Sequence, residues 1–215
     1  MTAPFRSPSG IFEQLLIAAD EALRTLSGAT TPQRPSPAPS REAPADERDR
    51  RHAAGLMRVN HTGEICAQAL YTGQALFARD AAVRDALRTA AAEERDHLAW
   101  CRERLADLGA RTSLLDPVWY AGSLGWGMIS GLAGDRWSLG FLAETEAQVE
   151  QHLEGHLDRL PASDVASRTI VARMRDDESR HGATGRSLGA TELPGAVKRA
   201  MRAASRVMTR TAYWV

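Results

Sequence analysis

Apolar side chains recur every third or fourth residue through most of this 215-residue chain, which is the spacing of amphipathic helices. Alternating apolar and polar runs, which are typical of strands, are almost missing. The pattern predicts helices near residues 11–26, 46–79, 81–108, 136–160, 163–189 and 194–210. Residues that favour helix boundaries stand between them, at Gly109, Pro117, Pro161 and Pro194. We therefore expect an all-α fold.

Four of the long helices carry acidic residues in the middle of an apolar stripe. In the 81–108 helix, the stripe from Leu87 to Leu105 is interrupted by Glu94 and His97, one turn apart. The 163–189 helix has a second Glu-x-x-His pair, and the two other helices place glutamates inward. In chain order, the predicted inward groups are Glu64, Glu94, His97, Glu146, Glu150, Glu178 and His181.

These inward carboxylates need a cationic partner. An unpaired ionised carboxylate in an apolar interior costs several kcal/mol, while a whole domain is stable by only about 5–15 kcal/mol. Most basic residues of these helices fall off the stripes, so a metal is the simplest partner. Carboxylates and imidazoles suit iron or manganese better than structural zinc.

The distribution of these groups over four helices points to two metal ions. One Glu on each of two helices, with Glu-x-x-His on each of two others, is the di-iron pattern of ferritin-like four-helix bundles. We therefore expect a ferritin-like four-helix bundle with additional amphipathic or interfacial helices, and two Fe ions per subunit. Glu146 and Glu150 remain alternatives for one ligand, because both lie on the inner face of the 136–160 helix.

The chain divides into three predicted parts. Residues 1–28 should contain an N-terminal amphipathic helix. Residues 29–45 carry five of the ten prolines and should form an extended linker. Residues 46–215 should form the ferritin-like domain, including the last helix near 194–210.

Residues 117–134 carry no charged side chain and five glycines, so they would make a weakly apolar helix. Trp119, Tyr120 and Trp126 belong to the residue types that favour a membrane–water interface. We expect this segment to lie on a bilayer surface; the alternative is a buried connector inside the bundle. The last helix has basic residues that favour anionic lipid headgroups, namely Lys198, Arg199, Arg202, Arg206 and Arg210.

Composition narrows the functional class. The 27 basic and 27 acidic residues balance, which gives no support for nucleic-acid binding. Cys66 and Cys101 do not make a disulfide framework, so we expect a reducing compartment. The short apolar cluster at 15–19 is flanked by acidic residues, which is not typical of a signal peptide. A prokaryotic cytoplasmic protein is the expectation.

Several longer segments resemble one family, from about residue 11 to the C-terminus. They are MRVNHTGEICAQALYTGQ, AAEERDHLAWC, DPVWYAGS, GDRWSLGFLAETEAQVEQHLEGHL, DDESRH and VMTRTAYWV. These resemble the bacterial demethoxyubiquinol hydroxylases of ubiquinone biosynthesis. The resemblance implies a membrane-associated di-iron monooxygenase that uses dioxygen to hydroxylate the ring of a demethoxy polyprenyl benzoquinol.

Carried over motif by motif, the resemblance gives the metal ligands and no catalytic residue beyond them. The implied ligands are Glu64, Glu94, His97, Glu150, Glu178 and His181. The resemblance thus chooses Glu150 over Glu146. His156 matches a histidine near the site of animal members, but Leu157 stands where those members have an aromatic residue.

The resemblance also implies partners and a location. The partners are the polyprenyl benzoquinol, dioxygen, the membrane surface and possible ubiquinone-biosynthesis partner proteins, with no nucleic acid. The location is peripheral, on the cytoplasmic face of the bacterial inner membrane. The competing hypotheses are a ferritin-like iron store or sensor, another di-iron oxidase and a non-catalytic membrane adaptor.

Overall fold

A computed structural model describes residues 10–215, and every regular element in that range is an α-helix. Residues 1–9 of the predicted N-terminal segment lie outside the described residues. The helices are α1 Ile11–Ser27, α2 Glu47–Phe77, α3 Ala81–Asp107, α4 Asp116–Leu132, α5 Asp135–Arg159, α6 Val165–Ser187 and α7 Gly195–Ala212. The all-α prediction is confirmed.

Short polar side chains set the starts of three bundle helices. Asp46 accepts hydrogen bonds from the backbone N–H groups of Arg48 and Asp49, which α2 leaves without a partner in its first turn. Asp80 and Asp164 do the same at the starts of α3 and α6. The chain leaves α3 through Gly109, whose φ of 68° is the left-handed conformation that favours glycine.

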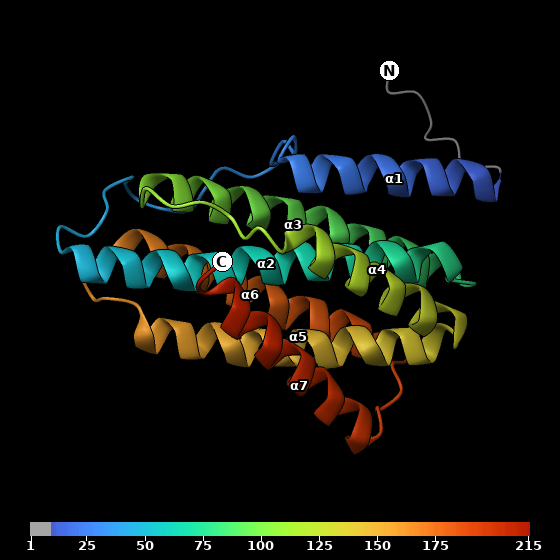
Figure 1. Ribbon diagram of the computed structural model, residues 1–215. Helices are drawn as coiled ribbons and strands as arrows, with labels where there is room; N and C mark the ends of the chain where they lie inside the picture. Colours follow the sequence, from blue (N-terminus) through green and yellow to red (C-terminus); the bar gives the residue numbers. More distant parts are fainter. Residues whose placement is uncertain (1–9) are drawn as a thin grey trace.

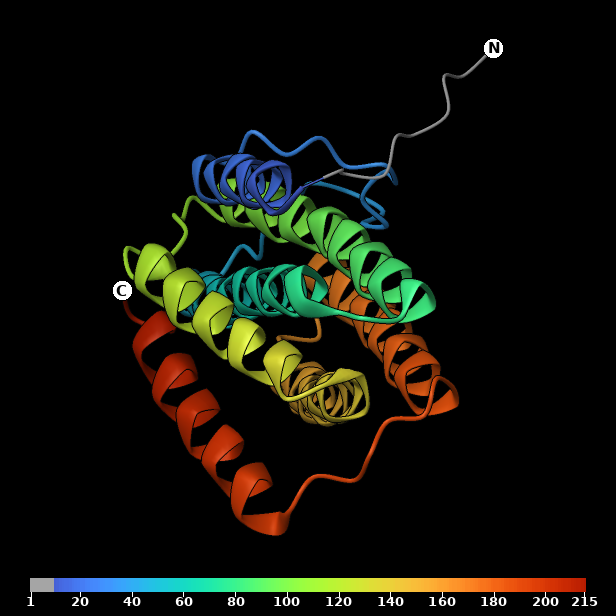
Figure 2. The ribbon, with the colours of Figure 1, turned by 90° about the vertical axis from the view of Figure 1, so that its right-hand side faces the viewer.

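Helices α2, α3, α5 and α6 run side by side as a four-helix bundle (Figures 1 and 2). Two apolar clusters fill its interior, one towards each end. Met57, Leu105 and Leu153 belong to one cluster, and Leu87 and Leu139 belong to the other. In α2, α3 and α5 the predicted inward acids fall between these clusters along the chain, so the polar site lies at mid-bundle.

Helix α4 packs on the outside of the bundle against α2, and glycines make this close approach possible. A Cβ atom on Gly127 would lie 2.2 Å from the carbonyl oxygen of Leu70, and one on Gly73 would lie 2.5 Å from that of Leu124. The opposite face of α4 exposes Trp126. Two of the five glycines of the 117–134 segment, Gly127 and Gly131, therefore serve packing against α2, while an apolar face of α4 remains open. Within residues 10–215, no helix has the length and apolarity needed to cross a bilayer.

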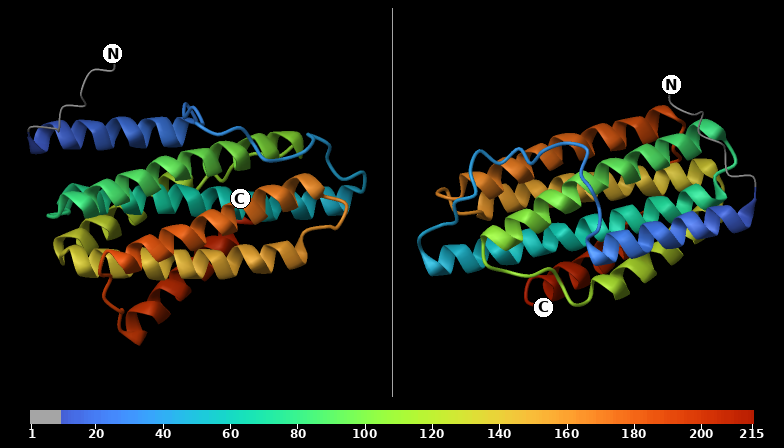
Figure 3. Two further views of the ribbon diagram at one scale, coloured as in Figure 1. Left: turned by 180° about the vertical axis from the view of Figure 1, so that it is seen from behind. Right: turned by 90° about the horizontal axis from the view of Figure 1, so that it is seen from above.

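The remaining elements lie around the bundle. Helix α7 crosses it obliquely on the side of α5, and α1 lies on the opposite side (Figures 1 and 2). Residues 29–45, which we call the strap, contain no regular element and connect α1 to α2. Viewed from above in Figure 3, the strap passes over α3 and reaches α6.

Candidate metal centre

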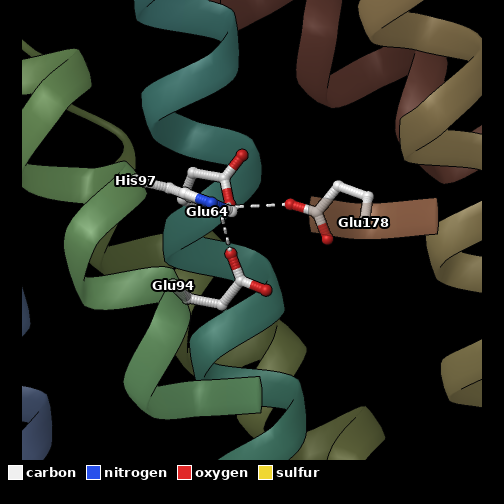
Figure 4. A group of neighbouring side chains, drawn as sticks. All are labelled: Glu64, Glu94, His97 and Glu178. Atoms are coloured by element: carbon white, nitrogen blue, oxygen red, sulfur yellow. Dashed lines mark hydrogen bonds and ion pairs between the residues drawn. The ribbon is translucent and has the colours of Figure 1, made fainter. Parts of the chain in front are cut away.

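Two overlapping groups of buried carboxylates and imidazoles lie at mid-bundle. The first group joins Glu64 from α2, Glu94 and His97 from α3, and Glu178 from α6 (Figure 4). The second group contains Glu94, Glu146, Glu178 and His181. Within each group, one ligand atom per residue lies within 4.8 Å of every other. Glu94 and Glu178 belong to both groups, so the two groups share two carboxylates.

Protein hydrogen bonds alone do not satisfy the first group. His97 Nδ1 has three carboxylate oxygens around it, from Glu94 at 3.0 Å, Glu178 at 3.2 Å and Glu64 at 3.6 Å. One ring nitrogen carries at most one hydrogen, so it cannot donate to all three. This convergence is the arrangement that a metal ion would satisfy.

The second group shows the same crowding. His181 Nδ1 lies 3.1 Å from Glu178, 3.4 Å from Glu94 and 3.6 Å from Glu146. In the described part of the chain, one oxygen of each of these glutamates is buried without a hydrogen-bond donor. Such atoms are costly unless an ion or a water molecule partners them. Carboxylate oxygens and imidazole nitrogens are donors that suit a pair of cations such as iron or manganese.

The electrostatics divide the four glutamates into two kinds. Burial, followed by the charge of Glu94, raises the pKa of Glu64, and burial with the charge of Glu178 raises that of Glu146. Burial also opposes ionisation of Glu94 and Glu178, but hydrogen bonds from the two imidazoles outweigh it and lower the pKa of both. Glu94 and Glu178, the two carboxylates that both groups share, are thus the ones that ionise most readily.

The cluster imidazoles respond in the opposite sense. Burial alone would lower the pKa of His97 and His181, but hydrogen bonds to the surrounding carboxylates raise both. Protons therefore balance the charge of the carboxylates in the protein itself. A metal ion that binds here would have to displace those protons, so its affinity would rise with pH.

Each cluster histidine has a carboxylate on its outer nitrogen. His97 Nε2 lies 3.1 Å from Asp177 Oδ2, and His181 Nε2 lies 2.8 Å from Glu93 Oε2. Carboxylates in this position fix the ring orientation and tautomer of a metal-binding histidine. The Tyr71 hydroxyl donates a hydrogen bond to Glu146 Oε1.

The structure brings together five of the six residues that the resemblance implied, and Glu150 is not among them. Glu150 is half-buried and lies outside both groups, while Glu146 is 1 % exposed and belongs to the second group. Residues four apart share a helix face but differ by about 6 Å along the axis. The apolar stripe sets the face of α5, and the level of the cluster along α5 brings Glu146, but not Glu150, into the second group.

His156 lies outside both groups. Its ring packs against that of His152, with 4.0 Å between the ring centroids. Burial lowers the pKa of His156 to about 2 and that of His152 to about 4, so both imidazoles are neutral at pH 7.

Sequence patterns give little sign of three groups just outside the cluster, namely Tyr71, Glu93 and Arg34. Tyr71 shares the inward face of α2 with Glu64, which is the one signal that could identify it. Glu93 precedes Glu94, but only Glu94 has the spacing to His97. Arg34 of the strap, which contacts Asp177, has no periodic pattern around it.

An apolar cavity of about 360 Å³ reaches the carboxylate cluster at Glu64, which helps to line it. Helices α2, α4, α5 and α7 line it. Its walls include large apolar side chains, namely Trp119, Trp126, Phe141, Leu153, Met201 and Met208. The cavity is therefore suited to an apolar molecule whose one end meets the carboxylate cluster.

Comparison with known proteins gives a consistent match. The family model of the ubiquinone biosynthesis protein COQ7 matches residues 51–212. A protein of Ralstonia pickettii named 3-demethoxyubiquinol 3-hydroxylase is 58% identical over 90% of this chain and 95% of its own length. Proteins with the same name from Bordetella parapertussis and Bordetella petrii are 57% and 55% identical, over 96% and 99% of this chain and 94% and 95% of their lengths.

Proposed function

Because the chain belongs to the ubiquinone biosynthesis protein COQ7 family, we propose that it is a 3-demethoxyubiquinol 3-hydroxylase. Its substrate would be a demethoxy polyprenyl benzoquinol, and dioxygen would supply the new ring oxygen. The observation that carries this proposal is the apolar cavity that Glu64 of the carboxylate cluster helps to line. An iron store would need the carboxylate cluster but would have no use for such a cavity.

Two iron ions are the proposed cofactor. Their ligands would be Glu64, Glu94, His97, Glu146, Glu178 and His181. Four carboxylates balance the charge of two ferrous ions. Bound there, the irons would supply electrons to dioxygen.

The protein's own groups would position the substrate and the ligands. The cavity walls would exclude water and hold the ring beside Glu64. The Tyr71 hydroxyl would keep Glu146 oriented, and Asp177 would hold His97 in one tautomer. No protein nucleophile is required.

The membrane proposal rests on α4 and α7, which both line the cavity. The open face of α4 presents Trp126, Ile129 and Leu132, each more than half exposed. Helix α7 presents exposed arginines such as Arg206 beside it. We propose that these two helices rest on the cytoplasmic face of the inner membrane, so that the polyprenyl tail enters from the bilayer.

The reaction is tested by giving the iron-loaded protein labelled dioxygen, a reductant and a short-tailed demethoxy-quinol. One labelled oxygen atom should appear on the ring, because the ring lies beside the metal site. Mass spectrometry of the quinone product measures it. Label that appears only in water or peroxide, with the ring unchanged, would support another di-iron oxidase or an iron store.

The membrane contact is tested with Ile129→Ser and Leu132→Ser together, since neither residue lines the cavity. We expect the double variant to bind anionic liposomes more weakly in a flotation assay, because it removes apolar area from the proposed contact face. The matched control is Leu16→Ser with Leu23→Ser, two exposed leucines on α1. Equal losses in both variants, or no lipid binding by the unchanged protein, would contradict the proposed face.

A further inference from the structure

The strap makes specific contacts with the bundle although it has no regular structure. Its prolines fix φ and remove backbone N–H donors, which keeps residues 29–45 out of helix. Where it crosses α3, the backbone N–H of Gln33 donates to Asp96 Oδ1 at 2.6 Å. The Trp100 indole N–H donates to the carbonyl of Arg34 at 3.1 Å. These bonds fix the strap at the position of Arg34.

The Arg34 side chain joins two bundle helices at this point. Its Nε donates to Asp96 Oδ2 on α3 at 2.6 Å, and its Nη1 donates to Asp177 Oδ2 on α6 at 2.7 Å. The guanidinium also lies over the Trp100 ring, 5.0 Å from its centroid. A guanidinium is a planar group with several donors in fixed directions, so it holds both carboxylates in defined places.

Asp177 passes this constraint to the metal site. The same Oδ2 atom that receives Arg34 lies 3.1 Å from His97 Nε2, and His97 Nδ1 faces the carboxylates of the first group. Asp177 is 1 % exposed. Arg173 and Arg180 also pair with it, from the exposed side of α6. Of these three arginines, Arg34 is the one that comes from outside α6 and ties Asp177 to α3 as well.

The outer nitrogen of His181, in the second group, has no comparable support. The outer partner of His181 is Glu93, whose side chain is 31 % exposed. Among the hydrogen bonds and ion pairs of residues 10–215, none joins Glu93 to the strap. The two histidines therefore occupy similar positions in the bundle but differ in how firmly they are held.

We propose that the strap secures one metal position selectively, with Arg34 as a positioning residue that acts through Asp177 on His97. The inference rests on the proposed two-metal centre. It adds that the position served by His97 releases its ion more slowly than the position served by His181. The N-terminal segment is thereby part of the metal-binding machinery and not only a linker.

The test compares Arg34→Gln with Arg41→Gln in the full chain loaded with ferrous iron. Arg41 is a matched control because it also joins the strap to α3, through Asp107, but contacts neither Asp96 nor Asp177. A colorimetric chelator in excess measures release, and two phases are expected for the unchanged protein. Arg34→Gln should speed the slow phase by up to about 10–100-fold, since losing the outer partner of a ligand itself typically costs that much in metal affinity or activity. The fast phase and the Arg41→Gln protein should be unchanged.

Two further variants separate positioning from folding. Arg34→Lys keeps the positive charge but loses the planar guanidinium. Its slow phase of iron release should therefore have a rate between those of the unchanged protein and Arg34→Gln. If Arg34→Gln fails to fold, Asp177→Asn removes the same link while keeping the side-chain shape. Equal acceleration of both phases, or the same effect from Arg41→Gln, would overturn the strap proposal. An unchanged protein that binds no iron would instead overturn the metal centre itself.

Discussion

Replacing Glu178 with alanine should remove iron from both metal positions and abolish hydroxylation. Glu178 belongs to both groups of ligand atoms, and its oxygens lie 3.2 Å from His97 Nδ1 and 3.1 Å from His181 Nδ1. Its pKa is lowered despite burial, so it is one of the two carboxylates that stay charged. Removing it takes a charged ligand from each ion at once. Bound iron should fall from two ions per chain towards none.

Iron content by elemental analysis and product formation from the demethoxy-quinol measure this effect. A thermal unfolding series adds a second readout, since a bound ion stabilises only the folded state. The unchanged protein should melt at a higher temperature when iron is added, and the Glu178→Ala protein should not. Circular dichroism should show the same helix content in both, because the apolar clusters at each end of the bundle are untouched.

The control for this prediction is Asp176→Ala, on the same helix. Asp176 pairs with Arg175 at the surface, and its side chain is 63 % exposed. Its loss should leave iron content and turnover unchanged. If Glu178→Ala unfolds the bundle, Glu178→Gln keeps the shape and removes only the charge. Full iron content in a folded Glu178 variant would show that the buried cluster is not the metal site.

The bundle could be predicted well because the apolar stripe in the sequence of each helix is the face that the helix buries. In this chain such a stripe is buried by packing against other helices. The ends of α3 and α5 lie within one residue of the predicted limits. An acidic pair in the middle of such a stripe is costly without a partner. Two Glu-x-x-His pairs, Glu94 with His97 and Glu178 with His181, can therefore be predicted as buried polar groups from the amino-acid sequence alone.

The uncharged segment at 117–134 shows where composition is ambiguous. Its lack of charge and its aromatic residues predicted a membrane-surface segment, and its glycines predicted a weak helix. In the structure, Gly127 and Gly73 let α4 lie close to α2, so part of that composition reflects helix packing. The exposed residues of α4 still form an apolar face. Composition alone does not separate a surface that meets a helix from one that meets lipid.

The contacts of the strap could not be predicted. A segment without periodic structure gives no face and no register, so the position of Arg34 depends on the path of the chain after α1 ends. Only the folded structure brings Arg34 to Asp177, which is 143 residues away in sequence. Contacts of this kind are fixed by the assembled bundle and not by local preference.

The choice between Glu146 and Glu150 leads to the second large effect. Replacing Glu146 with alanine should remove the ion held with His181 and abolish turnover. Glu150→Ala should leave iron content and turnover near those of the unchanged protein. Glu146 is buried, accepts a hydrogen bond from Tyr71 and lies 3.6 Å from His181 Nδ1. Glu150 lies one turn further along α5, outside both groups.

The two variants form a matched pair, since each removes one carboxylate from the same face of the same helix. Iron content should fall to about one ion per chain in Glu146→Ala, because only one ligand group of the di-iron pattern loses a member. The iron content of Tyr71→Phe should lie between those of Glu146→Ala and the unchanged protein, since this variant keeps the Glu146 carboxylate and removes its hydrogen-bond donor. Loss of iron in Glu150→Ala with normal iron in Glu146→Ala would restore the family-based choice of Glu150. That result would require α5 to shift by one turn, about 6 Å along its axis, when metal binds.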